Sequence, residues 1–430
     1  MREIMAQQSE LVHRVAIFGA GVSGQAARRL CQDRGYASVL FDEKGNGDRR
    51  EITAADLSEF DRFVWSPGFA EGHAWRALVA GLGKLSQSEV AFAASHWRGK
   101  VIGVTGTNGK TSLTRLLVAA LREVGVEASA VGNIGHAFSD TVVDVPSQAD
   151  TWAVCELSSF QAELPEGLML DGLVWTNFAE DHLDRYSSQQ AYFEAKARLF
   201  GCLKVGAPCL IGASVVEWAG IYGLELPASA SLMEDTVMLA LSASSPFAQA
   251  PQSANYAMAC SLWAALGFPM EALQRAADAF ELSAHRLACC GRIGDVTFWN
   301  DSKATNFHAV ESALDNFSGP VFWIGGGVSK GGDIAGFTER ISGKIEAAFA
   351  FGAVGPELVK GFQAVNFPVS FANRFEDMVR LAGEAALTRG EGIVLMSPGF
   401  ASFDQFTSYA ERGKSFISIV LGLMETRTME

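Results

Sequence analysis

The chain has 430 residues, enough for about three domains with large hydrophobic cores. Its formal net charge of −14 argues against nucleic acid or an anionic membrane as the main partner. Seven cysteines without any Cys-x-x-Cys spacing suit a reducing compartment, the polar N-terminus is not a signal peptide, and no apolar run approaches the ~18 residues that span a bilayer. These features favour a cytoplasmic enzyme.

Residues 1–97 begin with the strand–turn–helix pattern of a nucleotide-binding domain. The predicted strand starts at Arg14, and the turn after it carries glycines in G-x-G-x-x-G register: Gly19, Gly21 and Gly24. A second predicted strand ends in Asp42, 18 residues after the last of these glycines. This spacing resembles a dinucleotide fingerprint. Two alternatives stay open: a tight turn needed only for packing, and a half-domain that binds a nucleotide other than nicotinamide.

Residues 103–111, Gly-Val-Thr-Gly-Thr-Asn-Gly-Lys-Thr, are the most informative stretch of the chain. They lie between an apolar run that predicts a strand and a segment with helical spacing. A glycine-rich turn in this place offers backbone N–H groups to phosphates at the positive end of a helix. Lys110 would add a charge for the terminal phosphates, and the Thr111 hydroxyl would bind magnesium. The stretch predicts a nucleoside triphosphate site, although Val104 stands where the general pattern has its first glycine.

Residues 98–282 alternate strand and helix patterns, which predicts a mostly parallel sheet covered on both faces. Glu156 closes a buried strand, and a carboxylate at a strand end beside a phosphate loop commonly binds magnesium. The alternative for Glu156 is an ordinary solvated or helix-capping acid. On spacing alone, His182 is more typical of a hydrogen-bonded structural residue, and Lys196 of the surface of a helix.

Residues 283–430 repeat the strand–helix pattern and predict a Rossmann-like third domain. In all three segments a polar cluster follows a predicted strand, at residues 66–68, 177–182, 301–306, 325–332 and 397–406. Open α/β sheets bind their ligands at the carboxyl ends of the strands. The repetition therefore favours a ligand site in each segment, although residues 301–305 alone are equally compatible with a plain turn.

These motifs resemble the Mur ligases, the ATP-dependent amide-forming enzymes of peptidoglycan synthesis, over nearly the whole chain. The phosphate loop at residues 105–111 is specific to that superfamily. Further runs look like its D-glutamate-adding branch, at residues 132–135, 156–161, 180–186, 300–306 and 397–406. The resemblance implies three α/β domains: a Rossmann-like domain for the UDP-linked substrate (1–97), a central phosphate-loop ATPase domain with a parallel sheet (98–282) and a Rossmann-like domain for the amino acid (283–430).

The resemblance also implies the residues of the ATP and metal sites. The ATP site would comprise Gly106, Thr107, Asn108, Gly109, Lys110, Thr111, Ser112, Asn255, Arg286 and Asp301. Two Mg²⁺ ions are implied, one held by Thr111 and Glu156 and the other by His182 and Lys196. Lys196 would act as its carbamate, because a carbamate offers the oxygen ligand that magnesium prefers. The implied catalytic residues are Lys110, His182 and Lys196.

The remaining implied residues belong to the other two substrates. Those for UDP-N-acetylmuramoyl-L-alanine are Gly21, Val22, Ser23, Gly24, Asp42, Glu43, Ser66, Pro67, Gly68 and Asn133. Those for D-glutamate are Lys303, Thr305, Lys330, Ser402, Phe403 and Tyr409. The implied enzyme joins the two substrates through an acyl phosphate, and we expect it to be a cytoplasmic monomer. The alternatives are a Mur-type ligase for another amino acid or substrate, a nicotinamide-binding oxidoreductase, and a nucleotide-binding protein without catalysis.

Overall fold

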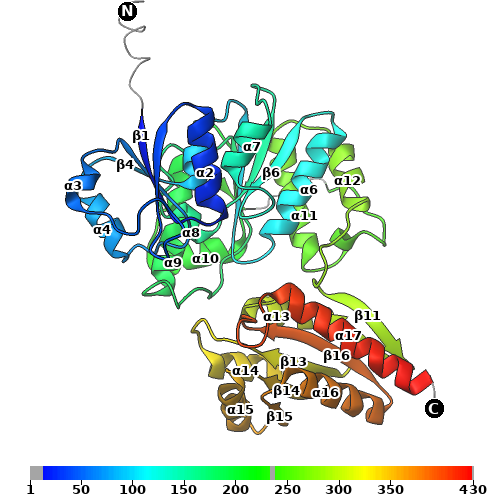
Figure 1. Ribbon diagram of the computed structural model, residues 1–430. Helices are drawn as coiled ribbons and strands as arrows, with labels where there is room; N and C mark the ends of the chain where they lie inside the picture. Colours follow the sequence, from blue (N-terminus) through cyan, green and yellow to red (C-terminus); the bar gives the residue numbers. More distant parts are fainter. Residues whose placement is uncertain (1–12, 233–237, 429–430) are drawn as a thin grey trace, which may run out of the picture. The chain divides into compact units, whose positions relative to one another are not determined.

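The computed structural model describes residues 13–232 and 238–428, which contain three β-sheets (Figure 1). The polar N-terminal stretch, which we do not expect to be a signal peptide, lies within residues 1–12, outside the described residues. The described chain forms two compact units. The first takes in residues of the ranges 1–178, 190–245 and 255–280, and the second takes in residues 179–189, 246–254 and 281–430. The predicted α/β class with a three-domain layout is confirmed, whereas the boundaries at residues 97 and 282 stay predictions.

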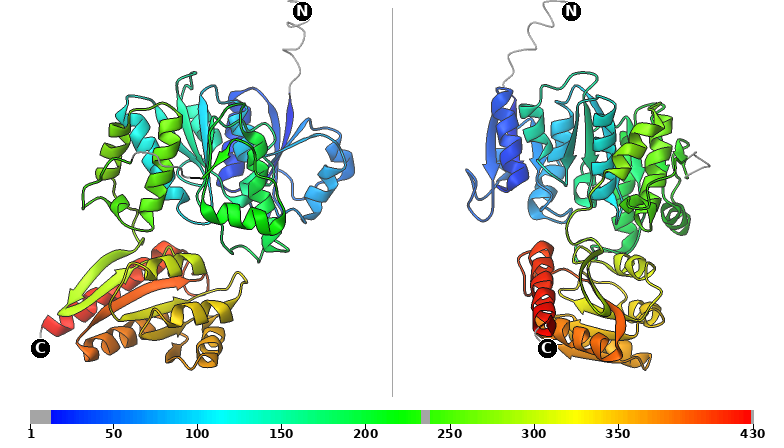
Figure 2. Two further views of the ribbon diagram at one scale, coloured as in Figure 1. Left: turned by 180° about the vertical axis from the view of Figure 1, so that it is seen from behind. Right: turned by 90° about the vertical axis from the view of Figure 1, so that its right-hand side faces the viewer.

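The first unit contains the two N-terminal sheets, which can be followed by colour from blue to green in Figure 2. The first sheet is entirely parallel, with the strand order β2 (Ala37–Phe41), β1 (Arg14–Phe18), β3 (Arg62–Trp65) and β4 (Leu85–Ser88). Phe18 and Trp65 stack with ring centroids 3.8 Å apart in its core. The helices that accompany it are α2 (Val22–Asp33), α3 (Ala54–Leu57), α4 (Ala74–Ala80) and α5 (Glu89–Ala94).

The second sheet carries the phosphate loop near its centre. It is also parallel, in the order β10 (Ala230–Ser231), β9 (Cys209–Ile211), β8 (Gly172–Trp175), β5 (Lys100–Thr105), β7 (Trp152–Glu156) and β6 (Ala128–Gly132). Strands buried on both faces are expected to be continuous apolar runs, and every residue of β7 and β8 is buried. Its helices are α6 (Lys110–Glu123), α7 (Phe138–Asp144), α8 (Ser159–Ala162), α9 (Gln189–Ala197), α10 (Ala213–Tyr222), α11 (Gln252–Ala265) and α12 (Met270–Asp278), with short 3₁₀ turns η2 (Arg198–Cys202) and η3 (Pro246–Ala248).

The third sheet lies in the second unit and has one antiparallel edge strand. Its order is β11 (Ala288–Ile293), β12 (Asp295–Asn300), β16 (Glu391–Gly399), β13 (Val321–Gly326), β14 (Ala347–Phe351) and β15 (Val369–Ala372), with only the β11–β12 pair antiparallel. Side chains alternate along β13. Trp323 packs with α13 (Phe307–Leu314), α14 (Ile334–Ser342) and α15 (Gly355–Ala364), whereas Phe322 and Ile324 pack with α16 (Phe375–Arg389) and α17 (Tyr409–Thr428).

The predicted polar clusters lie at the carboxyl ends of strands in all three sheets. The phosphate loop follows β5, Glu156 is the last residue of β7, and Asp301 directly follows β12. This places the candidate side chains on loops that rigid parallel strands hold in register. None of the helices in the described part of the chain has the length and apolar character needed to cross a membrane.

Candidate functional site

The phosphate loop has two positions that only glycine can occupy without strain. Gly106 has a φ of 143°, and a Cβ there would lie 2.0 Å from Thr176 Oγ1. Gly109 has a φ of 85° and caps the N-terminus of α6, and a Cβ there would lie 2.5 Å from Asn255 Oδ1. The second contact shows that the structure brings Asn255, on α11, against the loop. The backbone thus forms a glycine turn at a helix N-terminus, which suits a phosphate group.

Two lysines from different helices converge on one carbonyl of this loop. Lys110 Nζ donates to Gly106 O at 2.7 Å and to Thr107 O at 2.8 Å. Lys196 Nζ, from α9, donates to the same Gly106 O at 3.1 Å. Lys196 is only 1% exposed, so the surface position that spacing alone favoured is wrong. Two lysine side chains from different helices thus meet at one backbone carbonyl of the phosphate loop.

Glu156 provides a carboxylate oxygen suited to a metal ion beside the loop. It lies on β7 opposite Val104 of β5, and its side chain is buried. Oε1 accepts a hydrogen bond from Asn133 Nδ2 at 2.9 Å, whereas Oε2 is buried and has no hydrogen-bond partner among the described residues. An unpaired buried carboxylate oxygen is costly unless a cation binds it. A hard oxygen ligand in this place fits Mg²⁺, together with the hydroxyl of Thr111 in the first turn of α6.

Two residues that support the phosphate loop, Thr176 and Asn177, were not among the predicted site residues. Thr176 Oγ1 donates to Asn108 O at 2.6 Å. Asn177 accepts two hydrogen bonds from the loop: its Oδ1 accepts from Asn108 N at 2.9 Å, and its backbone O accepts from Thr107 N at 3.0 Å. The sequence feature that could have pointed to them is the change from apolar to polar residues at the end of β8, a strand that pairs with β5.

The glycine turn of the first sheet is brought together with Asp42 and Ser66. A Cβ at Gly24 would lie 1.7 Å from Gly19 O, so α2 begins in close contact with the turn. Ser66 Oγ donates to Gly19 O at 3.4 Å, and Asp42 Oδ2 accepts from Ala20 N at 3.0 Å. The Ala20 N–H is the main reason that the pKa of Asp42 lies below its usual value.

The other predicted substrate residues of this sheet lie at the start of α2, after β2 and after β3. Gly21 is the N-cap of α2, with Val22, 77% exposed, and Ser23 in the first turn of the helix. Pro67 and Gly68 follow β3 directly, and Glu43 Oε1 lies 3.3 Å from His73 Nε2. Their contacts with a substrate stay predictions.

In the third sheet, the loops after β12 and β16 bring several predicted amino-acid-binding residues together. Lys303 Nζ lies 4.2 Å from the centre of the Tyr409 ring. Ser402 is buried on the loop after β16, while its neighbour Phe403 is 74% exposed. Thr305 is half-buried on the loop after β12. Lys303 and Tyr409 are therefore neighbours, while Thr305 lies on the loop after β12 and Ser402 and Phe403 lie on the loop after β16.

Arg412, which sequence reasoning missed, holds these loops together. It is fully buried, and it donates to Ser302 Oγ at 3.0 Å, Phe400 O at 3.1 Å and Gly326 O at 3.4 Å. These acceptors come from the ends of β12, β16 and β13. Burial lowers the pKa of Arg412 to about 10. Its neighbours in the sequence, Glu411, Gly413 and Lys414, are charged or small, so the local pattern does not predict burial.

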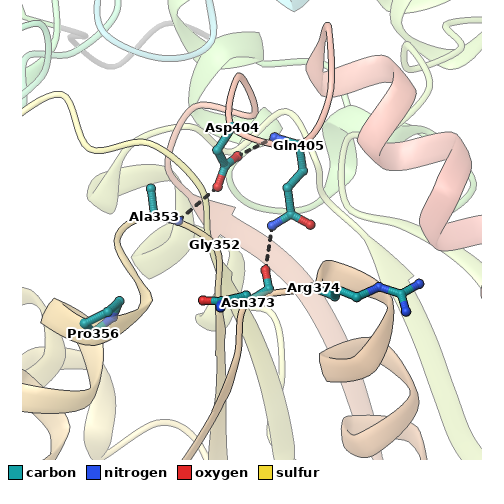
Figure 3. Close-up of a pocket in the computed structure, with 7 residues that line it drawn as sticks. All are labelled: Gly352, Ala353, Pro356, Asn373, Arg374, Asp404 and Gln405. Atoms are coloured by element: carbon teal, nitrogen blue, oxygen red, sulfur yellow. Dashed lines mark hydrogen bonds between the residues drawn. The ribbon is translucent and has the colours of Figure 1, made fainter.

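The loop after β16 is also tied to the ends of β14 and β15. Asp404 Oδ2 accepts from Ala353 N at 3.0 Å, and Gln405 Nε2 donates to Asn373 O at 2.8 Å (Figure 3). These residues line a cavity of about 400 Å³, together with Gly352, Pro356 and Arg374. The Asp-Gln pair of the 397–406 motif thus anchors the loop that carries Ser402 and Phe403.

Asp301 and Arg286, predicted to contact ATP, lie near each other in the second unit. Asp301 Oδ2 accepts from Ser397 Oγ at 2.8 Å, and Asp301 Oδ1 accepts from Leu287 N at 3.1 Å. Burial raises the pKa of Asp301 to about 7, against the opposing effect of these donors and of the Arg286 charge. Both of its oxygens are therefore already engaged by the protein.

Asp181 joins two residues that were predicted to serve different ligands. Its carboxylate lies 3.1 Å from Lys330 Nζ and accepts from His182 N at 2.8 Å. Burial of Asp181 favours its neutral form, but the charges of Lys330 and His182 bring its pKa below the usual value. His182 belongs to the second unit, and its predicted sharing of a metal with Lys196 stays a prediction.

Comparison with known proteins identifies the family. Residues 104–216 match the Mur ligase middle domain. A UDP-N-acetylmuramoylalanine–D-glutamate ligase of Gloeobacter violaceus is 32% identical, covering 95% of this chain and 99% of the relative. A ligase of the same name from Caulobacter vibrioides is 31% identical, covering 95% and 96%.

Solved structures show the same fold at low sequence identity. MurF from Acinetobacter baumannii superposes with a TM-score of 0.61 at 12% identity, covering 96% of this chain and 94% of that one. MurF from Thermotoga maritima, in complex with ADP, gives 0.59 at 15% identity and covers 97% of both chains. Full-length relatives above 30% identity and a shared fold lead to one conclusion: the chain belongs to the Mur ligase family of ATP-dependent ligases.

Proposed function

We propose that this ligase joins D-glutamate to UDP-N-acetylmuramoyl-L-alanine, a step of peptidoglycan precursor synthesis. The relatives that match nearly end to end carry this activity in their names. The structural observation that carries the proposal is the convergence of Lys110 and Lys196 on Gly106 O, at 2.7 and 3.1 Å. The ammonium group of Lys110 at a glycine turn suits the transfer of a γ-phosphoryl group, and Lys196 lies beside the same carbonyl, where its carbamate would hold a metal ion.

The proposed reaction has two steps. The carboxylate of the L-alanyl group attacks the γ-phosphorus of ATP, ADP leaves, and an acyl phosphate forms. The amine of D-glutamate then attacks the acyl carbon, and phosphate leaves from the tetrahedral intermediate as the amide forms. Phosphorylation converts a carboxylate oxygen, which is a poor leaving group, into phosphate.

In the first step we assign Lys110 to the terminal phosphates and Glu156 with Thr111 to one Mg²⁺. Magnesium, when bound, offsets the negative charge that the phosphates carry during transfer. His182 and Lys196, the latter as a carbamate, are assigned to a second Mg²⁺, and Asn255, Arg286 and Asp301 to the rest of ATP. The burial of Lys196 supports this assignment, because a carbamate needs a site protected from solvent exchange.

In the second step we assign the edge of the third sheet to D-glutamate. The amino acid brings two carboxylates, and Lys330 and Lys303 supply cations for them. Thr305 and Ser402 offer hydroxyl donors, while Phe403 and Tyr409 wall the site. The glycine turn at Gly21 is assigned to the pyrophosphate of the UDP-linked substrate. Cytoplasmic location and a monomeric state stay predictions.

The test is phosphate release from ATP with UDP-N-acetylmuramoyl-L-alanine, with and without D-glutamate. Sustained release that requires both substrates, with formation of the amide product, is the expected result. A panel containing L-alanine, a diamino acid and D-glutamate decides the amino acid. Preference for another amino acid would reject the specificity, and tight binding of NADH with no phosphate release would reject the ligase reaction.

A further inference from the structure

Asn133 is fixed against Glu156 through its backbone. β6 ends at Gly132, whose partner in the register of β7 is Glu156. Gly132 has a φ of 93°, and a Cβ there would lie 2.3 Å from Glu156 O. Because the backbones of β6 and β7 approach so closely, Asn133 N donates to Glu156 O at 2.9 Å. The position of Asn133 is therefore set by the end of the strand that carries the carboxylate.

The side chain of Asn133 binds the same residue again. Its Nδ2 donates to Glu156 Oε1 at 2.9 Å. An ionised carboxylate only accepts hydrogen bonds, so the amide must turn its N–H₂ group toward it. One bond to one oxygen restricts rotation of the Glu156 carboxylate. Oε2 is the oxygen left over, buried and without a hydrogen-bond partner in residues 13–232 and 238–428.

The strand order places this pair beside the phosphate loop. β7 lies between β6, which leads to Asn133, and β5, which leads to the loop. Leu157 N, next to Glu156, donates to Val104 O at 2.8 Å, and Thr105 Oγ1 donates to Leu157 O at 2.8 Å. Glu156 is thus bracketed by Asn133 on one side and by the start of the phosphate loop on the other.

We propose that Asn133 is a positioning residue of the magnesium site. It holds Oε1 of Glu156 and so leaves Oε2 as the oxygen that binds the cation. The inference rests on the proposed function, because that function identifies the ligands of this site as Mg²⁺ and ATP. It gives Asn133 a role at the nucleotide, acting through Glu156, whereas the family resemblance placed Asn133 at the UDP-linked substrate. Groups that orient metal ligands typically change metal affinity about 10- to 100-fold when removed.

The test is binding of Mn²⁺, as a spectroscopic substitute for Mg²⁺, to the full chain with a non-hydrolysable ATP analogue. Electron paramagnetic resonance measures the free Mn²⁺. Asn133→Ala should weaken Mn²⁺ binding about tenfold or more while the KM for UDP-N-acetylmuramoyl-L-alanine changes less than about twofold. Asn133→Leu removes the donor without leaving a cavity and should behave in the same way. In a Glu156→Gln background, Asn133→Ala should cause no further loss.

Ser66→Ala is the matched control at the proposed UDP-substrate site. It should raise the KM for that substrate and leave Mn²⁺ binding within about twofold of the wild type, the reverse of the Asn133 pattern. Wild-type Mn²⁺ affinity in Asn133→Ala or in Asn133→Leu would overturn the inference, whatever happens to the substrate KM. If the wild-type protein releases no phosphate with both substrates, the proposed function fails, while the Mn²⁺ measurement still decides the role of Asn133.

Discussion

Lys330 Nζ lies 3.1 Å from Asp181 Oδ1, inside the second compact unit. Asp181 Oδ2 also accepts from Asn306 Nδ2 at 3.2 Å, and Asp181 Oδ1 accepts from the backbone N of His182. One buried carboxylate therefore holds both the cation that we assign to D-glutamate and the segment that carries the proposed metal ligand His182. The geometry implies that Asp181 sets the position from which Lys330 meets the amino acid.

The Asp181–Lys330 relationship is testable by a double-mutant cycle. Lys330→Ala should raise the KM for D-glutamate about tenfold or more, because a carboxylate of the substrate loses its cation. Asp181→Ala should also raise this KM, because Lys330 is no longer held. In the Lys330→Ala background the Asp181→Ala effect should shrink markedly. Steady-state kinetics of the four proteins provide the measurement, and strictly additive effects would contradict the coupling.

Lys110→Ala should leave the fold intact and lower turnover about 10²-fold or more, because the phosphates lose a fixed charge. Lys204→Ala is the control in the same unit, since Lys204 forms only a half-exposed ion pair with Asp171 at 2.8 Å. Such pairs contribute little to stability, so this variant should keep wild-type turnover. Phosphate release and thermal melting report the two properties. Near-wild-type release by a folded Lys110→Ala protein would refute the role of the lysine.

Lys196→Ala should be nearly inactive, and a small added carboxylate such as formate should restore part of the activity. The reason is that the proposed carbamate oxygen would be replaced by a free carboxylate oxygen near Gly106. Lys196→Arg is the sharper control, because it keeps a cation but cannot form the carbamate. Phosphate release with and without formate distinguishes the cases. Full activity of Lys196→Arg would mean that a positive charge at this position suffices for the reaction, which would contradict the carbamate.

The strand, glycine turn and helix around residues 106–109 could be predicted because the glycines, the lysine and the flanking strand are contiguous in the sequence. The sequence also placed Asp42 and Asp301 at strand ends, since strand periodicity is local. It could not show that Lys196 is buried, because the partner that buries it, Gly106 O, is 90 residues away in the chain. Arg412 was missed for the same reason, since its acceptors lie on three separate loops. Contacts that form only when distant strands pair leave no local pattern.

The two glycines that open α2 should respond differently to substitution. A Cβ at Gly21 meets no atom within 4 Å, whereas a Cβ at Gly24 would lie 1.7 Å from Gly19 O. Gly21→Leu should therefore fold normally and raise the KM for the UDP-linked substrate far more than that for ATP. Gly24→Ala should lower the melting temperature by several degrees, because the turn must shift. Equal effects of Gly21→Leu on both KM values would contradict the assignment of this turn to the pyrophosphate.

Glu89 should make the stability of the chain depend on pH. Its side chain is 3% exposed at the start of α5, and Oε1 accepts from Ser139 N at 2.7 Å. Burial raises the pKa of Glu89 to about 7 in the folded chain, above its value in the unfolded chain. The folded state therefore prefers the protonated form. The stabilisation is complete below the ordinary glutamate pKa and is lost as the pH rises toward about 7, with a slope of at most ~1.4 kcal/mol per pH unit.

Glu89→Gln tests this dependence, because the amide cannot ionise yet still offers Oε1 to Ser139 N. The melting temperature of the variant relative to the wild type should rise between pH 5 and pH 8, since only the wild type must bury a charge at the higher pH. Glu384→Gln, at an exposed position of α16, is the matched control and should give the same difference at both pH values. A Glu89→Gln difference that does not change with pH would show that Glu89 is ionised, or protonated, throughout this range.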